Sequence, residues 1–352
     1  MYKRILSLCL VLLLLTGLWS GMTAAAAAEE ELSIVTTIFP VYDWVREILG
    51  SHGQETQLTM LLDSGVDLHS FQPTVDDIVK ISTCDLFIYV GGESDGWVDD
   101  ALQESENPDM IVLNLLDILG DAAKEEEVVE GMESDHDHDH EDEEHEGEDH
   151  EHDSEDHEDE DHEHDGEDHE DEEVEYDEHV WLSLKNAGTL CGAIADALAR
   201  LDPENAADYG DNLSAYREQL AALDDEYAQA AAAAQRDTVL FGDRFPFRYL
   251  TDDYGLKYYA AFSGCSAETE ASFQTIVFLA GQVDALGLRT ILQIESADGA
   301  IARTIRDNTA SKDQEILTMD SMQATTAKDV ADGVTYLSVM ASNLDVLTQA
   351  LQ

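Results

Sequence analysis

Short apolar runs and amphipathic segments alternate along residues 32–115. Four runs of β-branched and apolar residues predict buried strands, at 32–39, 57–62, 85–90 and 110–115. Between them, residues 41–49 and 74–83 place apolar side chains on one helical face, and a shorter helix is expected around Trp97. Strands that alternate with helices predict a parallel sheet with right-handed crossovers.

A second series of the same kind occupies the C-terminal third of the chain. Strands are predicted at residues 238–242, 257–262, 290–294 and 315–318. Helices are predicted at residues 245–254, 272–286, 299–310 and 328–351. The repeated alternation predicts a second parallel sheet with its own helices.

The segment between the two series has helical spacing throughout. Residues 180–201 predict one helix, and Asp202-Pro203 supplies a capping residue and a proline suited to the start of the next. Apolar residues then recur at intervals of three and four, at Leu213, Tyr216, Leu220, Leu223 and Tyr227. A helix of roughly 30 residues spans about 45 Å. That length is enough to join the halves of a two-lobed protein.

These elements predict an α/β fold of two lobes, each with a small parallel sheet and surrounding helices, joined by one long rigid helix. The expected divisions are a signal peptide at 1–28, an N-terminal lobe at 29–120, an insertion at 121–178, the end of the N-terminal lobe at 179–201, the linking helix at 202–236 and a C-terminal lobe at 237–352.

The insertion changes this picture because it contains almost no apolar residues. Ten of the chain's 13 histidines lie in it, among carboxylates and without lysine or arginine between 134 and 179. Such a segment cannot form a core, and imidazole is a preferred ligand of zinc, copper and nickel. We interpret it as a disordered, metal-collecting loop rather than an inert acidic one. Its histidines are His136, His138, His140, His145, His150, His152, His157, His162, His164 and His169.

The first 28 residues have the pattern of a secretory signal. Lys3 and Arg4 precede an apolar run, which is followed by small residues at 24–28. The run is shorter than the about 20 apolar residues that a membrane span needs, although an uncleaved anchor is the alternative. We therefore expect an exported protein, periplasmic or on the extracellular face of the cytoplasmic membrane.

Charge and cysteine content limit the possible functions. The formal net charge of −62 argues against nucleic acid and anionic membrane surfaces as partners, and it favours cations. Three cysteines follow the signal, Cys84, Cys191 and Cys265, and none forms a CxxC pair. They are interpreted as small buried residues or one disulfide, and a zinc-thiolate site has no support from their spacing.

Four polar residues lie where ligands bind in open α/β sheets, near the carboxyl ends of strands or before a helix. They are His69, His179, Asp243 and Asp320. Each has an ordinary structural explanation when taken singly, as a surface histidine or a capping aspartate. Asp243 could also pair with the adjacent Arg244 or with Arg248.

The local sequences around these residues resemble a known family. GVDLHSFQP is similar to G-x-D-P-H-x-Y/F-x-P, and DEHVWLSLKNA is similar to D-P-H-x-W-L-S-P-x-N-A, both motifs of the zinc/manganese solute-binding proteins of ABC importers, which include the ZnuA-like proteins. FGDRFPFRYLTDDYGL and TMDSMQ resemble two further segments of that family. The resemblance implies metal ligation by His69, His179, Asp243 and Asp320 in a cleft between the lobes.

Departures from the family pattern leave the metal open. Leu68 and Glu178 replace prolines, and Asp243 stands where zinc-binding members usually have histidine and manganese-binding members have glutamate. Two imidazoles and two carboxylates would admit Mn²⁺, whereas the histidine-rich loop favours Zn²⁺. Glu295, Glu268 and Glu270 are reserve ligands if Asp243 does not bind.

The function expected from this resemblance is capture of Zn²⁺ and its delivery to the membrane permease of an ABC importer. We expect no enzymatic activity, because HExxH and GxSxG motifs are absent from the sequence. We also expect a monomer that binds no organic substrate. The alternatives are a secreted zinc buffer or chaperone, a manganese-binding member of the same family, an adhesin and a metallohydrolase.

Overall fold

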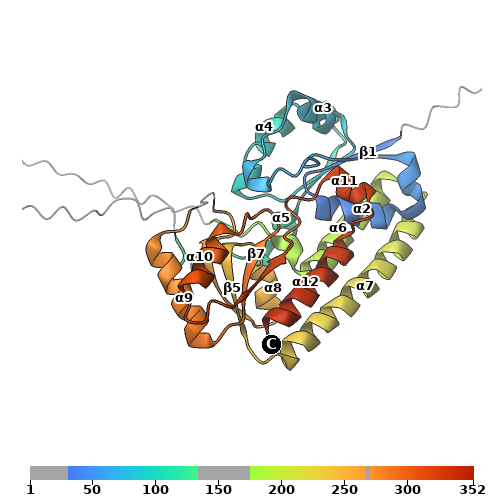
Figure 1. The fold of residues 1–352 in the computed structure, drawn as a ribbon. Helices are drawn as coiled ribbons and strands as arrows, with labels where there is room; N and C mark the ends of the chain where they lie inside the picture. The colour runs from blue at the N-terminus through green and yellow to red at the C-terminus, as the bar shows by residue number, and fades with distance from the viewer. Residues whose placement is uncertain (1–30, 134–174, 267–269) are drawn as a thin grey trace, which may run out of the picture.

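The computed structural model describes residues 31–133, 175–266 and 270–352, which form two lobes (Figure 1). Each lobe contains one four-stranded parallel sheet, with strand order β2-β1-β3-β4 in the first and β6-β5-β7-β8 in the second. The predicted α/β fold of two lobes is therefore confirmed. The predicted signal peptide and the ten histidines of the insertion lie outside the described residues.

The N-terminal sheet is built from β1 (Leu32–Thr36), β2 (Thr56–Met60), β3 (Leu86–Tyr89) and β4 (Ile111–Asn114). Its helices are α2 (Phe39–Leu49), α3 (Val75–Thr83), α4 (Val98–Gln103), α5 (Leu115–Leu119) and α6 (Leu184–Leu201). Pro40, expected to end the first strand, instead occupies the first turn of α2, where its missing N–H leaves no bond unmade. Thr74 caps α3 in a capping box with Asp77.

The C-terminal sheet is built from β5 (Thr238–Phe245), β6 (Lys257–Ser263), β7 (Thr290–Ile294) and β8 (Glu315–Met319). Its helices are α8 (Arg248–Asp253), α9 (Phe273–Leu286), α10 (Ala300–Asn308), α11 (Ala327–Ala331) and α12 (Tyr336–Ala350). The single helix expected at 328–351 is thus two helices, separated where Gly333 has a positive φ of 96°.

The predicted linking helix is present as α7 (Ala206–Ala233), shorter than the expected 202–236. Asp202 ends α6 and accepts hydrogen bonds from Asn205 and Tyr209 instead of opening α7. One end of α7 lies on the N-terminal lobe, where Asn212 donates to the Ile48 carbonyl. The other end lies beside α12, where the Tyr227 hydroxyl donates to Met340 (Figure 1).

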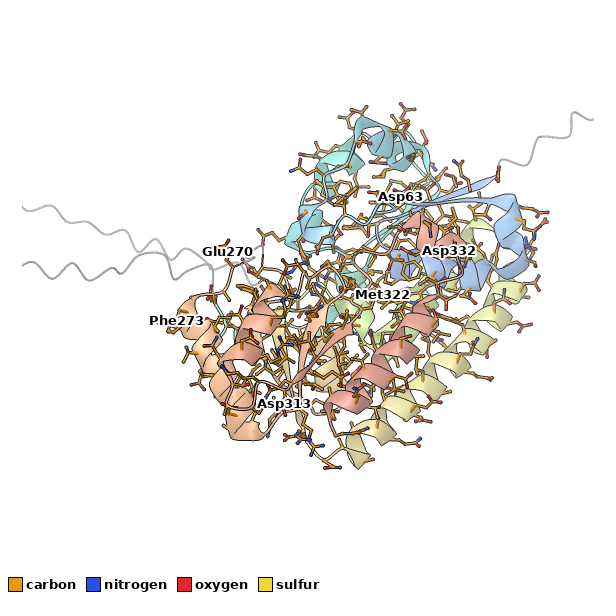
Figure 2. All side chains as sticks on the ribbon, in the orientation of Figure 1. Asp63, Glu270, Phe273, Asp313, Met322 and Asp332 are labelled. Atoms are coloured by element: carbon orange, nitrogen blue, oxygen red, sulfur yellow. The ribbon has the colours of Figure 1, made fainter. Side chains whose placement is uncertain are left out.

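The lobes share a continuous apolar core around α12. The ring of Tyr336 lies edge-on to that of Trp44, and its hydroxyl donates to the Trp181 carbonyl. Trp181 in turn donates through its indole N–H to the carbonyl of Ser321. The next residue, Met322, is buried between the lobes with a φ of 65° (Figure 2). These contacts join the two lobes.

The described ends of the predicted insertion belong to the fold. Glu125 forms an antiparallel bridge with Tyr176, and the N–H of Asp177 donates to the Lys124 carbonyl. Glu133 lies along β6 and donates through its N–H to Ala261. The described ends of the insertion therefore pack against each other and against the C-terminal sheet. None of the helices in the described ranges is long and apolar enough to cross a membrane.

Candidate metal centre

His69 is held in a short 3-10 turn, Leu68–Ser70, at the carboxyl edge of the N-terminal sheet. Asp67 caps this turn, since its Oδ1 accepts the His69 N–H at 3.0 Å. The imidazole Nδ1 lies 2.7 Å from the Ser94 hydroxyl and 3.4 Å from Glu178 Oε2. With only 8% of the side chain exposed, the ring is fixed with Nε2 directed away from these groups.

His179 precedes the 3-10 turn Val180–Leu182 and is completely buried. Asp177 fixes it twice, because one carboxylate oxygen accepts the backbone N–H at 2.9 Å and lies 3.0 Å from Nδ1. A carboxylate is acceptor only, so it places the imidazole proton on Nδ1 and leaves the Nε2 lone pair free. This carboxylate–histidine pairing is typical of metal-binding imidazoles.

The two imidazoles meet, with Nε2 of His69 3.2 Å from Nε2 of His179. Carboxylates near both Nδ1 atoms favour the tautomers that carry the proton on Nδ1. The two Nε2 lone pairs then face each other, and a shared cation stabilises this arrangement. An ion with Zn–N bonds of about 2.05 Å and tetrahedral angles separates two nitrogens by roughly 3.3 Å. The observed separation therefore fits a zinc ion.

The charges around the pair also favour a cation. Burial lowers the pKa of His69, and the neighbouring His179 lowers it further. Burial opposes the charged form of His179 too, but the carboxylates of Asp177 and Glu178 outweigh it and raise the pKa of His179. Negative groups that stabilise a proton on this imidazole stabilise a bound metal ion by the same attraction.

A third potential ligand comes from the C-terminal lobe. The Sγ of Cys265 and one nitrogen of each histidine all lie within 4.8 Å of one another. Cys265 follows the end of β6, and Gly264 before it is close enough to His179 that a Cβ would lie 3.0 Å from Cε1. Cys265 was not predicted as a ligand because no second cysteine stands beside it at ligand spacing in the sequence. The position of Cys265 just after a predicted strand was a usable signal.

Asp243 lines the same cavity between the lobes as His69 but is not in the close group with the two histidines. It was expected to end a strand at 242, but β5 continues to Phe245 through a register shift between Phe241 and Arg244. The carboxylate binds backbone at this irregularity, accepting the N–H of Arg244 at 2.8 Å and of Ile294 at 3.3 Å. Within the described ranges, Asp243 belongs to no group of three close potential ligands.

Asp320, Glu295 and Glu270 are also absent from the close group that contains the two histidines. Asp320 accepts the Met322 N–H, and burial together with nearby Glu295 raises the pKa of Asp320 to about 6. Glu295 itself accepts the N–H of Ser321 and its hydroxyl, both at 2.8 Å. Glu270, labelled in Figure 2, lines a cavity between the lobes together with His69. Glu268 lies outside the described residues. Of the four expected ligands, the structure brings His69 and His179 together and leaves Asp243 and Asp320 outside their close group.

A cavity of about 630 Å³ opens between the lobes next to His69. Asp67 and His69 line it from the N-terminal lobe, and Asp243, Arg244 and Asp298 line it from the C-terminal lobe. Arg244 crosses the cavity, with Nη2 2.7 Å from Asp67 Oδ2. His69 is therefore reached from a polar cleft between the lobes.

Comparison with family models places almost all of the described chain in one family. The model described as zinc-uptake complex component A, periplasmic (ZnuA), matches residues 34–350. The high-affinity zinc uptake system protein ZnuA of Bacillus subtilis is 27% identical over 348 residues, covering 99% of this chain and 96% of the relative.

Streptococcal relatives are longer than this chain. The zinc-binding lipoprotein AdcA of Streptococcus pneumoniae is 29% identical over 325 residues, which cover 92% of this chain and 56% of the relative. The chain thus spans about half the length of these relatives. The crystal structure of the Zn(II)-bound ZnuA-like domain of that AdcA superposes with a TM-score of 0.64, at 25% identity, covering 91% of this chain and 99% of the domain.

Proposed function

We propose, from the premise that the chain belongs to the family of periplasmic zinc-uptake component A proteins, that it captures Zn²⁺ outside the cytoplasm for import. The 3.2 Å separation between Nε2 of His69 and Nε2 of His179 is the observation that carries the proposal. In this account the protein binds and releases the ion without chemical change, as a solute-binding protein and not as an enzyme.

The donor chemistry favours zinc over manganese. Imidazole nitrogen suits zinc, whereas manganese prefers carboxylate, carbonyl and water oxygens. Asp243 and Asp320, which would supply oxygen ligands, are engaged with backbone N–H groups. Neither carboxylate belongs to the close group that the two histidines form. Zinc held mainly by nitrogen is therefore the favoured cargo.

The position of the two histidines suggests how capture and release are coupled to the lobes. Both belong to the N-terminal lobe, His69 between β2 and α3 and His179 before α6. The Arg244–Asp67 ion pair links the lobes beside them. Closed lobes exclude water and strengthen the attraction between ion and ligands, and separated lobes weaken it. Contact with a partner that parts the lobes would release the ion.

The partner in this proposal is the membrane permease of an ABC importer. The Bacillus relative is named as part of a high-affinity zinc uptake system, and zinc uptake requires a membrane component to move the ion. We propose that the chain works as a monomer at the outer face of the cytoplasmic membrane. Its acidic surface would raise the local concentration of cations there.

The experiment is a zinc titration of the exported chain against a competing chelator. The ten histidines of the segment from His136 to His169, called the tract from here on, are replaced by asparagine. This change keeps the chain length and the carboxylates of the tract and removes its imidazoles. This protein is expected to retain one tight zinc site per chain. His69→Ala and His179→Ala should each weaken that site by at least about tenfold, because loss of a ligand costs no less than loss of an outer hydrogen bond.

His52→Ala is the matched control, since His52 pairs with Asp208 on the far side of the N-terminal lobe. It should leave zinc affinity unchanged. If replacing the tract histidines abolishes tight binding, the protein is a zinc buffer whose active part is the tract. If manganese competes equally with zinc, the manganese-binding alternative holds instead.

A further inference from the structure

We propose that the thiolate of Cys265 is the ligand through which the C-terminal lobe binds the ion held by His69 and His179. This inference rests on the proposed function, because it assigns the third donor of that same site. The ion would then be bound by two imidazole nitrogens and one sulfur. The sulfur, as the donor from the C-terminal lobe, would join the lobes through the metal.

The three donor atoms have the spacing of a metal site. The Sγ of Cys265 and one ring nitrogen of each histidine lie within 4.8 Å of one another, and the Nε2 atoms of the two histidines are 3.2 Å apart. Zinc bonds of about 2.05 Å to nitrogen and 2.3 Å to sulfur place nitrogen and sulfur roughly 3.6 Å apart at tetrahedral angles. A shift of about 1.2 Å or less at Cys265 Sγ therefore completes the set, and a water or a carboxylate can supply the fourth ligand.

The backbone at Gly264, directly before Cys265, lies close to the His179 ring. Gly264 has no side chain, and a Cβ at this position would lie 3.0 Å both from Cε1 of His179 and from the Phe245 carbonyl. The N–H of Cys265 donates to Glu126 Oε1 at 3.0 Å, which fixes the residue from the segment that precedes the tract. A side chain at position 264 would therefore require the imidazole or the Phe245 carbonyl to move by a few tenths of an ångström.

The other two cysteines provide a contrast within the same chain. Cys84 and Cys191 are both fully buried in the apolar core, and the Cys84 thiol donates to the Ile81 carbonyl. All three cysteines are free. Cys265 alone among them lies with two imidazoles, and it is only partly buried. Its surroundings are those of a ligand rather than of a core residue.

Binding requires one proton to leave the thiol. Burial raises the pKa of Cys265, so the free protein holds the proton on Sγ. When the ion binds, a metal–sulfur bond forms, the S–H bond breaks, and the proton goes to solvent. Because thiolate is a soft ligand that selects zinc over manganese, Cys265 would add to the selectivity that the two imidazoles supply.

Cobalt substitution tests the assignment on the complete exported chain. Cobalt bound to thiolate gives a sulfur-to-metal charge-transfer band in the near ultraviolet, and the tract cannot produce it because the tract contains no cysteine. The wild-type protein should show this band with about one equivalent of cobalt. His69→Ala should weaken it, and Cys265→Ser and Cys265→Ala should abolish it.

Cys265→Ser and Cys265→Ala should also weaken zinc binding by at least about tenfold and reduce the preference of the protein for zinc over manganese. Alkylation mapping of the wild-type protein gives a second assignment that needs no variant. Zinc should protect Cys265 from alkylation, with buried Cys84 as the internal reference.

The outcomes separate this inference from the proposed function. Tight zinc binding that depends on His69 and His179, with no charge-transfer band and no protection of Cys265, overturns the inference alone. Zinc binding that is indifferent to both histidines overturns the proposed function as well. A charge-transfer band that is lost in the Cys265 variants supports both.

Discussion

The guanidinium of Arg244 in the C-terminal lobe lies 2.7 Å from the carboxylate of Asp67 in the N-terminal lobe. Less than one fifth of either side chain is exposed. Burial disfavours the charged form of Asp67, but Arg244 and His69 outweigh it and lower the pKa of Asp67. Since Asp67 also caps the turn that carries His69, this ion pair connects lobe contact to the placement of a proposed ligand.

A double-mutant cycle on this pair should show measurable coupling. Asp67→Asn, Arg244→Gln and the double variant are compared by the free energy of unfolding of the metal-free protein. We expect a coupling of about 1 kcal/mol, above that of exposed pairs because solvent screens this pair less. The exposed pair Lys257–Asp237 is the control and should show no coupling. Equal coupling in the two cycles would contradict a specific inter-lobe bond.

Asp177→Asn should weaken zinc binding by about 10- to 100-fold, because an outer carboxylate orients the imidazole and raises its basicity. The amide keeps an oxygen for the His179 N–H but loses the negative charge beside Nδ1. Affinity is measured by chelator competition in the protein without tract histidines. Asp253→Asn, which affects a carboxylate bound to Ser183 and Lys185, should have no effect on zinc. Equal affinities of the two variants would refute the role of Asp177.

Asp243→Asn should affect folding and not metal binding. The Asp243 carboxylate accepts N–H groups of Arg244 and Ile294, and an amide can accept only one of these well. Leaving a buried donor unsatisfied costs about 1–3 kcal/mol of unfolding free energy. Thermal or denaturant unfolding measures that loss, and the zinc affinity of the same variant should match the wild type. A large drop in affinity at unchanged stability would instead make Asp243 a ligand.

Asp43 should make the metal-free protein less stable as the pH rises. Burial raises the pKa of Asp43 from 3.8 to about 6, against the opposing effects of the Tyr336 N–H and Arg46. The folded protein therefore keeps a proton that the unfolded chain loses first. The stabilisation is complete below pH 3.8 and is lost as the pH rises to about 6, a change of about 3 kcal/mol.

Asp43→Asn removes this titration, so the stability of the variant relative to wild type should increase between pH 4 and pH 6. Denaturant unfolding in the presence of a chelator measures the difference. Glu47 on the same helix and Tyr216 on α7 also face Asp43, and both remain in the variant. Parallel stability curves for the two proteins would show that Asp43 does not titrate in this range.

The sequence predicted the histidine pair because both residues lie in motifs with a defined position beside strands and helices. The predicted strand end at Gly242 was wrong, because apolar periodicity ends there whereas the strand continues through an irregularity to Phe245. A register shift leaves no mark in the pattern of apolar residues. The aspartate that marked the expected strand end instead satisfies the backbone at that shift.

The predicted start of the long helix at Asp202 was also wrong, because α7 begins at Ala206. Asp202-Pro203 has the pattern of a helix start, but Asp202 binds the Tyr209 hydroxyl and ends α6. Tertiary contacts explain the described part of the insertion too, since Lys124 donates to the Tyr249 hydroxyl and Tyr258 donates to Glu127. Composition alone could not separate these packed acidic residues from the tract that follows them.

The most direct test of the account is anomalous diffraction at the zinc absorption edge from crystals of the protein without tract histidines, grown with one equivalent of zinc. We predict one strong peak between Nε2 of His69 and Nε2 of His179, about 2.0–2.1 Å from each. A zinc peak bound elsewhere, with these two nitrogens left without metal, would contradict the account.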